Sequence, residues 1–265
     1  MGDAALKSNQ NDVDGYHYDR MSQKVFHYLE HAGERLPANL LHVIHSRFNH
    51  DPVYNWTWKF CSVSEIGTCS NCRNQLTSGI LPSDIHQLEC EIISPKHNFS
   101  EIHGKDLGKN IHKELEDYHF KKFVKERGPF DVIIDGMNVG SYGSTSRFKF
   151  TQDLVEETVH HFASQQKKVL LIIRNEMITE DLHTKLENVC AVFINNFKND
   201  DLYFLYAAAF SGMQQVEVIT NDKLRDHRLL LPTKLWWTFL RWTRLNCVRF
   251  KVNDKGKTPF FQAKV

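Results

Sequence analysis

Four aspartates in the second half of the chain are candidate ligands for a metal centre. They are Asp135, Asp200, Asp201 and Asp222, and they follow the apolar runs FDVII, CAVFINN and VEVIT. Carboxylates held within a few ångströms of one another repel, unless protons, cationic side chains or a bound cation offset their charge. Oxygen ligands favour Mg²⁺ or Mn²⁺, and a pair of such ions can activate water and stabilise a leaving oxygen in phosphodiester hydrolysis. The pattern predicts a metal-dependent nuclease.

Each aspartate alone also suits an ordinary structural role. Acidic residues at strand ends form turns, and Asn199 or Asp200 could cap the helix that follows. For a single position the two interpretations carry about equal weight. The complete set, with its adjacent pair and the DGMN sequence after the first apolar run, favours the metal site. The run GMNVGSYG lacks the spacing of a phosphate-binding glycine loop, so it adds no support.

Alternating apolar and helical patterns in residues 128–252 predict how these side chains are positioned. Four apolar runs, FDVIID, KKVLLIIRN, CAVFINN and VEVITND, are separated by amphipathic stretches of helical period. This alternation predicts a Rossmann-like α/β fold with a parallel sheet covered by helices on both faces. Because the carboxyl ends of parallel strands meet at one edge, the four aspartates, Asp226 and His227 should gather there.

The remaining segments divide into four predicted regions. Residues 1–19 are polar and aperiodic, which predicts a disordered tail. Residues 20–50 predict two short helices broken at Gly33 and Pro37, the pattern of one helical-repeat unit. Residues 51–127 predict a central linker region, with a small sheet and knuckle followed by a Lys- and Glu-rich helix. Residues 253–265 form a C-terminal tail.

Composition narrows the class of protein. The formal net charge of +1 requires any nucleic-acid affinity to come from local basic patches. No apolar run reaches the roughly 18 residues of a membrane span. Six cysteines without a signal peptide indicate a reducing compartment, where thiols serve metals or cores rather than disulfides.

Three sequence runs carry a family resemblance. In order, FDVIIDGMNVG, NNFKNDDLYFLYAA and VITNDKLRDH resemble the NYN/PIN-like metallonuclease domain of protein-only ribonuclease P. The resemblance extends upstream through GTCSNCRNQL and LPSDIHQLE, and so covers residues 54–250. By position, the family's metal-binding aspartates fall on Asp135, Asp200, Asp201 and Asp222. Its Arg-Asp-His element falls on Asp226 and His227, and Asn138 would help to orient the site.

The resemblance implies an activity, cofactors and partners. It implies Mg²⁺- or Mn²⁺-dependent, two-metal hydrolysis that removes the 5′ leader of precursor tRNA. It also implies a mitochondrial location, with a tRNA methyltransferase and a short-chain dehydrogenase as partners, as in the animal member of the family. Two alternatives remain open: a catalytically weak RNA-binding or assembly subunit, and a general NYN-type ribonuclease that acts on other RNAs.

Cys69 and Cys72 have the spacing of half a tetrahedral zinc site. In the family, a His and a Cys near the C-terminus complete that site. This sequence has no His after His227, and its last cysteine is Cys247, so we expect an incomplete site in a chain that stops early. The local substitutes would be His86, Cys90 or His97. The family also carries a longer array of pentatricopeptide repeats, of which residues 20–50 resemble a remnant.

Basic and aromatic residues interleave in KLWWTFLRWTRLNCVRFK, a pattern of single-stranded RNA contacts. Arg241, Arg244 and Arg249 could meet phosphates there. Trp236 and Phe239 have helical spacing, which more often indicates a core. A second cluster, Lys121, Lys122, Lys125 and Arg127, equally suits a solvated helix face.

Overall fold

A computed structural model describes residues 24, 38–49, 59–64, 68–75, 80–94, 118–143, 150–196, 200–253 and 259–261. The chain divides into two compact units, Met1–Ile80 and Leu81–Val265. Each unit has its own structure and is described by itself.

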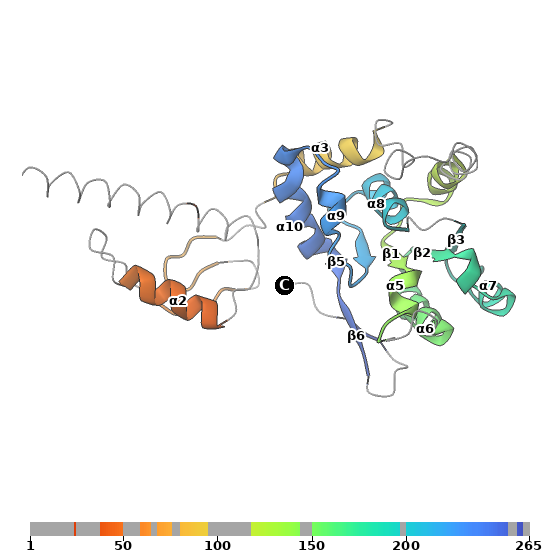
Figure 1. Ribbon diagram of the computed structural model, residues 1–265, viewed down its shortest axis with the longest axis horizontal. Coiled ribbons are helices and arrows are strands. Elements are labelled where there is room, and N and C mark those ends of the chain that lie inside the picture. The colour runs from red at the N-terminus through yellow and green to blue at the C-terminus, as the bar shows by residue number, and fades with distance from the viewer. Residues whose placement is uncertain are drawn as a thin grey trace, which may run out of the picture. The chain divides into compact units, whose positions relative to one another are not determined.

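A five-stranded parallel sheet forms the centre of the second unit (Figure 1). Its strands lie in the order β3-β2-β1-β4-β5. Ile133 in β1 pairs with Leu170 on one side and with Val218 on the other. The strand bounds are β1 Val132–Asp135, β2 Val169–Arg174, β3 Ala191–Asn195, β4 Glu217–Ile219 and β5 Cys247–Val248. The predicted parallel α/β sheet is confirmed.

Helices cover both faces of this sheet, as its near-continuous apolar strands require. Helix α6 (Gln152–Ala163) and helix α7 (Glu180–Leu186) pack on the face that carries Val132 and Ile134. Helix α8 (Asp200–Ser211) contacts β1, β2 and β4. The shorter helices and α10 are α5 Gly136–Gly140, η1 Asn175–Met177, α9 Arg225–Arg228, η2 Thr233–Leu235 and α10 Trp236–Asn246.

Helix α8 is apolar on most of its circumference because it lies inside the unit. Its segment 203–209 is buried throughout. Residues 118–127 are also helical, and from them the Phe120 ring lies 4.6 Å from Phe193 and 4.7 Å from Tyr203. This aromatic contact ties the 118–127 helix to β3 and α8. The compact unit therefore includes residues upstream of the domain start predicted at position 128.

The prediction of a small sheet is wrong for the segment after Ile80. Residues Pro82–Ile93 form helix α3, which packs against α8 and α10. A proline in its first turn suits a helix start, and Ile85, Leu88 and Ile92 recur at helical spacing and are buried. Burial of this apolar stripe against α8 stabilises a helix here rather than a strand.

The predicted C-terminal tail contains a strand. Strand β6 (Phe250–Val252) pairs antiparallel with β7 (Pro259–Phe261). The Phe261 ring lies 4.7 Å from Phe162 on α6. These residues therefore add to the apolar core of the second unit.

The first unit contains helix α2 (Ala38–Asn49) and two isolated antiparallel bridges, Val63 with Cys69 and Thr68 with Gln75. Helix α2 falls where the second helix of the repeat unit is predicted. The predicted disordered tail and the first repeat helix lie outside the described residues, apart from Lys24.

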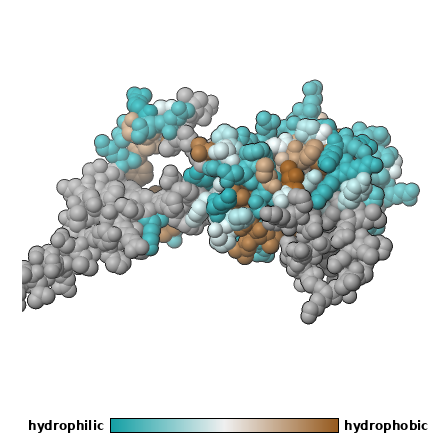
Figure 2. Space-filling view, turned by 90° about the horizontal axis from the view of Figure 1, so that it is seen from above, coloured by the Kyte–Doolittle hydropathy of each residue, from teal (hydrophilic) through white to brown (hydrophobic). Residues whose placement is uncertain are grey.

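Where the described residues are coloured, the surface seen in Figure 2 is mainly hydrophilic with small hydrophobic patches. Among the described residues, no helix has the length and apolar character needed to cross a membrane.

Truncating Leu88 should destabilise the second unit. Its side chain is fully buried on α3, so we expect Leu88→Ala to lower the free energy of unfolding by about 2–5 kcal/mol in urea titrations. Leu81, which is 62% exposed just before the same helix, is the matched control, and Leu81→Ala should change stability by less than about 0.5 kcal/mol. Equal effects of the two substitutions would contradict the packing of α3 on α8.

Candidate active site

An open cleft of about 580 Å³ lies at the carboxyl edge of the parallel sheet. The strand order reverses beside β1, where β2 lies on one side and β4 on the other, and ligands bind at such reversals in open α/β sheets. The residues that line the cleft include Asp135, Asn138, Arg174, Asp200, Asp201 and Asp222. The structure thus brings together the four predicted aspartates. Their role as metal ligands remains a prediction.

Asp135 lies at the centre of the group, at the end of β1 and at the N-cap of α5. Its two carboxylate oxygens have different partners. Oδ1 accepts a hydrogen bond from the backbone N–H of Asn138 at 3.0 Å, and Oδ2 accepts one from the hydroxyl of Thr220 at 2.9 Å. These bonds connect β1, α5 and the end of β4. They fix the orientation of the Asp135 carboxylate.

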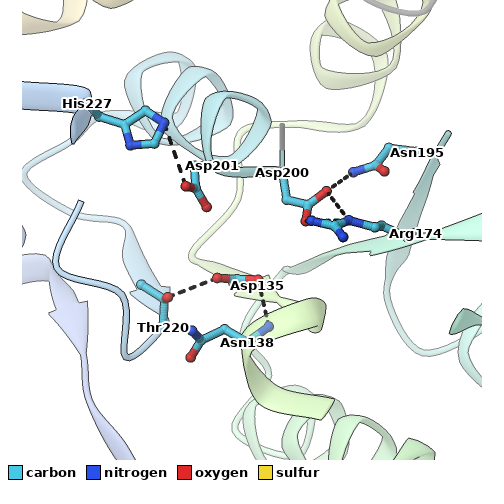
Figure 3. A network of polar contacts seen from close by, with 8 residues as sticks. All are labelled: Asp135, Asn138, Arg174, Asn195, Asp200, Asp201, Thr220 and His227. Carbon is cyan, nitrogen blue, oxygen red and sulfur yellow. Dashed lines mark hydrogen bonds and ion pairs between the residues drawn. The ribbon is translucent and has the colours of Figure 1, made fainter. Parts of the chain in front are cut away.

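The adjacent residues Asp200 and Asp201 begin α8 and point in different directions (Figure 3). Asp200 faces the end of β2, where the Arg174 guanidinium donates to it from Nη2 at 2.6 Å and from Nε at 2.9 Å. The Asn195 amide also donates to Asp200, at 2.6 Å. Asp200 is thus neutralised in this conformation by a bidentate ion pair.

Asp201 faces α9, and its Oδ2 lies 3.7 Å from Nε2 of His227. Burial lowers the pKa of His227, while the neighbouring Asp222 and Asp226 oppose that shift. A largely neutral imidazole compensates little of the Asp201 charge. This carboxylate is therefore the less well neutralised member of the pair.

Asp222 is held by the loop that follows β4. The backbone N–H of Asn221 donates to Oδ1 of Asn138 at 2.8 Å. The Asn221 side chain pairs with both backbone groups of Phe250, at 3.0 and 3.1 Å. Arg249 donates to the carbonyls of Thr220 and Asp222. The loop is thus clamped from both sides, by α5 and by the chain that leads into β6.

The electrostatics of the cleft show uncompensated negative charge. Burial, with added repulsion from Asp200 and Asp222, raises the pKa of Asp135 to about 6 against the hydrogen bonds from Asn138 and Thr220. Burial, with repulsion from Asp135, Asp222 and Asp200, raises the pKa of Asp201 to about 7. At neutral pH Asp201 is partly protonated and Asp135 much less so, whereas an ordinary aspartate is fully ionised. A cation at this edge would displace those protons and relieve the repulsion.

The donor set fits a hard divalent cation, since it consists of carboxylate oxygens on an open cleft. The side chains are not yet gathered around one point. Among the described residues, no three His, Cys, Asp or Glu side chains are placed to hold an ion. Asp200 is engaged by Arg174, so metal binding requires that ion pair to open or the ion to use the other carboxylates.

Of the other predicted site residues, some line the cleft and others do not. Asn138 lines the cleft, whereas Asp226 and His227 are not among its lining residues. Asp226 lies on α9 and is exposed. Sequence reasoning missed Arg174 and Thr220. The only signal for Arg174 is a basic residue at the end of an otherwise apolar strand.

The predicted RNA-contacting residues of α10 include core residues. Trp242 is fully buried, and its indole N–H donates to the carbonyl of Met213 at 2.7 Å. Phe239 is also buried. Arg249 binds the loop of Asp222, as described above. The core interpretation is confirmed for Phe239, whereas Trp236 is half-buried.

The predicted zinc ligands lie on different units. Cys69 and Cys72 belong to the first unit, whereas His86 and Cys90 lie one turn apart on α3 of the second, with Cys90 Sγ 3.6 Å from His86 Nε2. His97 lies outside the described residues. The zinc site remains a prediction.

Comparisons with known proteins identify the family. The model of protein-only RNase P matches residues 63–264, which is more than half of the chain. This chain belongs to the protein-only RNase P family. The mitochondrial ribonuclease P catalytic subunit of Mus musculus is 28% identical to it over 240 residues, which cover 87% of this chain and 39% of that protein. Proteinaceous RNase P 3 of Arabidopsis thaliana is 24% identical over 208 residues, covering 74% and 34%.

A solved structure of another family member has a fold similar to that of this chain. The crystal structure of nuclear proteinaceous RNase P 2 from A. thaliana matches with a TM-score of 0.55 and 19% identity, covering 77% of this chain and 41% of that one. The chain spans about two fifths of the length of the mouse relative. The family resemblance predicted from the acidic motifs is confirmed.

The raised pKa values predict how stability depends on pH. The pKa of Asp201 is about 7 in the folded chain and about 3.9 in an unfolded chain, so the folded state binds more protons between these values. Stability should therefore fall as the pH rises from about 4 to about 7. In urea titrations with EDTA, we expect Asp201→Asn to be more stable than the wild type above about pH 7, with a smaller difference near pH 5.

The exposed Asp153 on α6 provides the matched control, since Asp153→Asn removes a carboxylate outside the cleft. It should leave the pH dependence unchanged. A stability difference between wild type and Asp201→Asn that is the same at every pH would contradict the electrostatic account.

Proposed function

We propose that this protein-only RNase P is a metal-dependent endoribonuclease that removes the 5′ leader from precursor tRNA. The observation that carries the proposal is the convergence of Asp135, Asp200, Asp201 and Asp222 around one cleft at the carboxyl edge of the sheet. Family membership supports endoribonuclease activity of this type. Because the chain spans only part of its relatives, its own activity and substrate are part of the proposal.

The four aspartates are the proposed ligands for Mg²⁺ or Mn²⁺. When bound, the cation would stabilise negative charge on the scissile phosphate and lower the pKa of water. With two ions, one would activate the attacking water and the other would stabilise the leaving oxygen. The open cleft leaves room for a phosphodiester beside the carboxylates.

The protein's own groups orient the site and hold protons. The Thr220 hydroxyl and the backbone N–H of Asn138 fix the Asp135 carboxylate, and the backbone N–H of Asn221 fixes the Asn138 side chain. Without a cation, the Asp201 carboxyl has a pKa of about 7 and is partly protonated at neutral pH, and it would release that proton when it binds a cation. Asp200 can bind a cation only after Arg174 releases it. Once displaced, its guanidinium is a suitable donor to a phosphate of the RNA.

One observation favours a second candidate, a catalytically weak RNA-binding or assembly subunit. The bidentate Arg174–Asp200 ion pair already neutralises one of the four carboxylates. If the pair persists with substrate bound, the cleft binds cations weakly. RNA binding without cleavage would then be the chain's contribution.

The partners and the location are proposed by analogy with the family. We propose that a tRNA methyltransferase and a short-chain dehydrogenase assist the chain, and that it acts in mitochondria. The mouse and rat relatives carry "mitochondrial" in their names, whereas the solved Arabidopsis relative is a nuclear protein. Fractionation of cells that express the full chain would test the location.

Cleavage of 5′-labelled precursor tRNA tests the proposal. With Mg²⁺, alone or with the two partners, we expect one cut at the mature 5′ end, leaving a 5′-phosphate on the tRNA. Asp201→Asn should slow this cut by at least about 100-fold, because it removes a proposed ligand of the cation that would stabilise the reacting phosphate. The matched Asp153→Asn should cleave at the wild-type rate.

RNA binding, measured by fluorescence anisotropy, separates the two candidates. Tight binding with no cut under any of these conditions would overturn the nuclease proposal and support the binding subunit. Cuts spread along unrelated RNAs would instead indicate a general ribonuclease.

A further inference from the structure

The loop between β4 and α9, residues 220–224, carries Asp222 on an unfavourable backbone. Leu224 adopts a left-handed conformation with φ of 51°, and its side chain is buried. The backbone N–H of Leu224 donates to Oδ1 of Asp222 at 2.6 Å, so the orientation of this carboxylate depends on that conformation. A left-handed backbone is unfavourable for leucine and persists only where surrounding contacts hold it. Contacts from other elements must therefore stabilise the loop.

Arg249, which lies between β5 and β6, supplies one set of these contacts. Its Nη1 donates to the carbonyl of Thr220 at 3.2 Å and also to the carbonyl of Asp222. One guanidinium nitrogen thus joins the backbone on both sides of residue 221. The sequence suggests an RNA phosphate as a partner of Arg249, but in the structure this nitrogen is occupied by the protein's own chain.

Asn221 supplies the second set of contacts. Its Nδ2 donates to the carbonyl of Phe250 at 3.0 Å, and its Oδ1 accepts from the backbone N–H of Phe250 at 3.1 Å. An amide side chain can both donate and accept in this way, whereas a carboxylate can only accept. The backbone N–H of Asn221 donates to the Asn138 side chain at 2.8 Å. The residue type at position 221 thus suits its two contacts with Phe250.

The residues that hold the loop are themselves packed into the core. Phe250 is 2% exposed, and its ring lies 5.3 Å from that of Tyr142. Phe250 pairs with Phe261 between β6 and β7, and the Phe261 ring lies 4.7 Å from Phe162 on α6. The chain that leads into β6 is therefore a fixed support for the loop.

Thr220 connects the loop to a second carboxylate of the cleft. Its hydroxyl donates to Oδ2 of Asp135 at 2.9 Å and accepts from the backbone N–H of Asp222 at 3.1 Å. Because Arg249 binds the Thr220 carbonyl, a shift of this backbone would move the partner of Asp135 as well. The contacts of the loop therefore orient two of the four aspartates.

We propose that Asn221 and Arg249 are positioning residues of the acidic cleft, and that they orient Asp222 and, through Thr220, Asp135. They act through these carboxylates rather than on the RNA. The inference rests on the proposed function, in which the aspartates bind the cation. Replacing a group that orients metal ligands typically costs about 10–100-fold in metal affinity or activity. The hairpin of β6 and β7 is thereby a structural part of the active site.

Hydrogen exchange of the metal-free full chain tests the contacts without cation or RNA. In EDTA, amides of residues 220–224 should exchange at least about 10-fold faster in Arg249→Met than in the wild type, because the loop opens locally more often. Arg249→Lys should recover part of the protection, since its ammonium can donate to the same carbonyls. Lys251→Met removes the same charge from an exposed position on β6, and this matched control should exchange like the wild type.

Cation binding and cleavage then separate positioning from RNA contact. In the full chain, Arg249→Met and Asn221→Ala should each lower Mn²⁺ affinity by calorimetry and kcat for precursor tRNA by about 10–100-fold. The KM for precursor tRNA should change by less than about threefold, because no contact with the RNA is lost. Lys251→Met should retain the wild-type kcat and Mn²⁺ affinity. Circular dichroism at the assay temperature checks that each variant is folded.

Two results would overturn this inference and leave the proposed function intact. One is a wild type that binds Mn²⁺ and cleaves, with a folded Arg249→Met chain of unchanged Mn²⁺ affinity and kcat. The other is an Arg249→Met chain with a raised KM and an unchanged kcat, which would assign Arg249 to a phosphate of the RNA. A wild type that binds no Mn²⁺ would overturn the proposed function and this inference together.

Discussion

Repulsion among the carboxylates at one edge of the parallel sheet is the electrostatic constraint that the structure of the second unit must offset. Asp135 is 4% exposed and Asp200 is 5% exposed, yet both lie with Asp201 and Asp222 on the same cleft. Buried carboxylates of like charge cost free energy unless they are protonated, paired or bound to a cation. In this structure, protonation and ion pairing reduce that cost. Asp135 and Asp201 have raised pKa values, and Asp200 is paired with Arg174.

The scaffold holds this unfavourable group in place through contacts away from it. Strand β1 is buried on both faces, and α8 is packed into the interior by the aromatic contacts of Phe120 and Tyr203. The loop of Asp222 is clamped by Asn138 on one side and by the backbone of Phe250 on the other. Carboxylates with raised pKa values on a rigid frame are typical of functional sites. The same frame explains why the acidic residues cannot simply move apart.

The sequence predicts most of the sheet and the acidic cleft, because both follow from short-range patterns and one topological rule. Apolar runs with helices between them require a parallel sheet. Asp135 ends β1, and Asp222 follows the adjacent strand β4. Helix α3 was missed because its apolar stripe, Ile85, Leu88 and Ile92, is short and follows an aromatic, turn-rich stretch that favours strands. The strand at 259–261 was missed because three residues carry no period.

Contacts between residues that are far apart in the chain could not be predicted from the sequence. Arg174 and Asp200 are 26 positions apart, and only the packing of α8 over β2 brings them into contact. The contact between the Cys61 and Cys69 thiols likewise depends on the isolated antiparallel bridge of Val63 with Cys69. The sheet edge could therefore be assigned from residue types, whereas the partners that neutralise or complete each site required the fold.

Proton release on metal binding tests the central claim most directly. Titration calorimetry with Mn²⁺, repeated near pH 6.5 in two buffers of different ionisation enthalpy, gives the number of protons displaced from the chain. The raised pKa values of Asp135 and Asp201 predict release of about one proton per bound ion at that pH and much less near pH 8.5. Binding without proton release at either pH, or binding of equal strength to Asp135→Asn, would contradict a shared cation site built from these carboxylates.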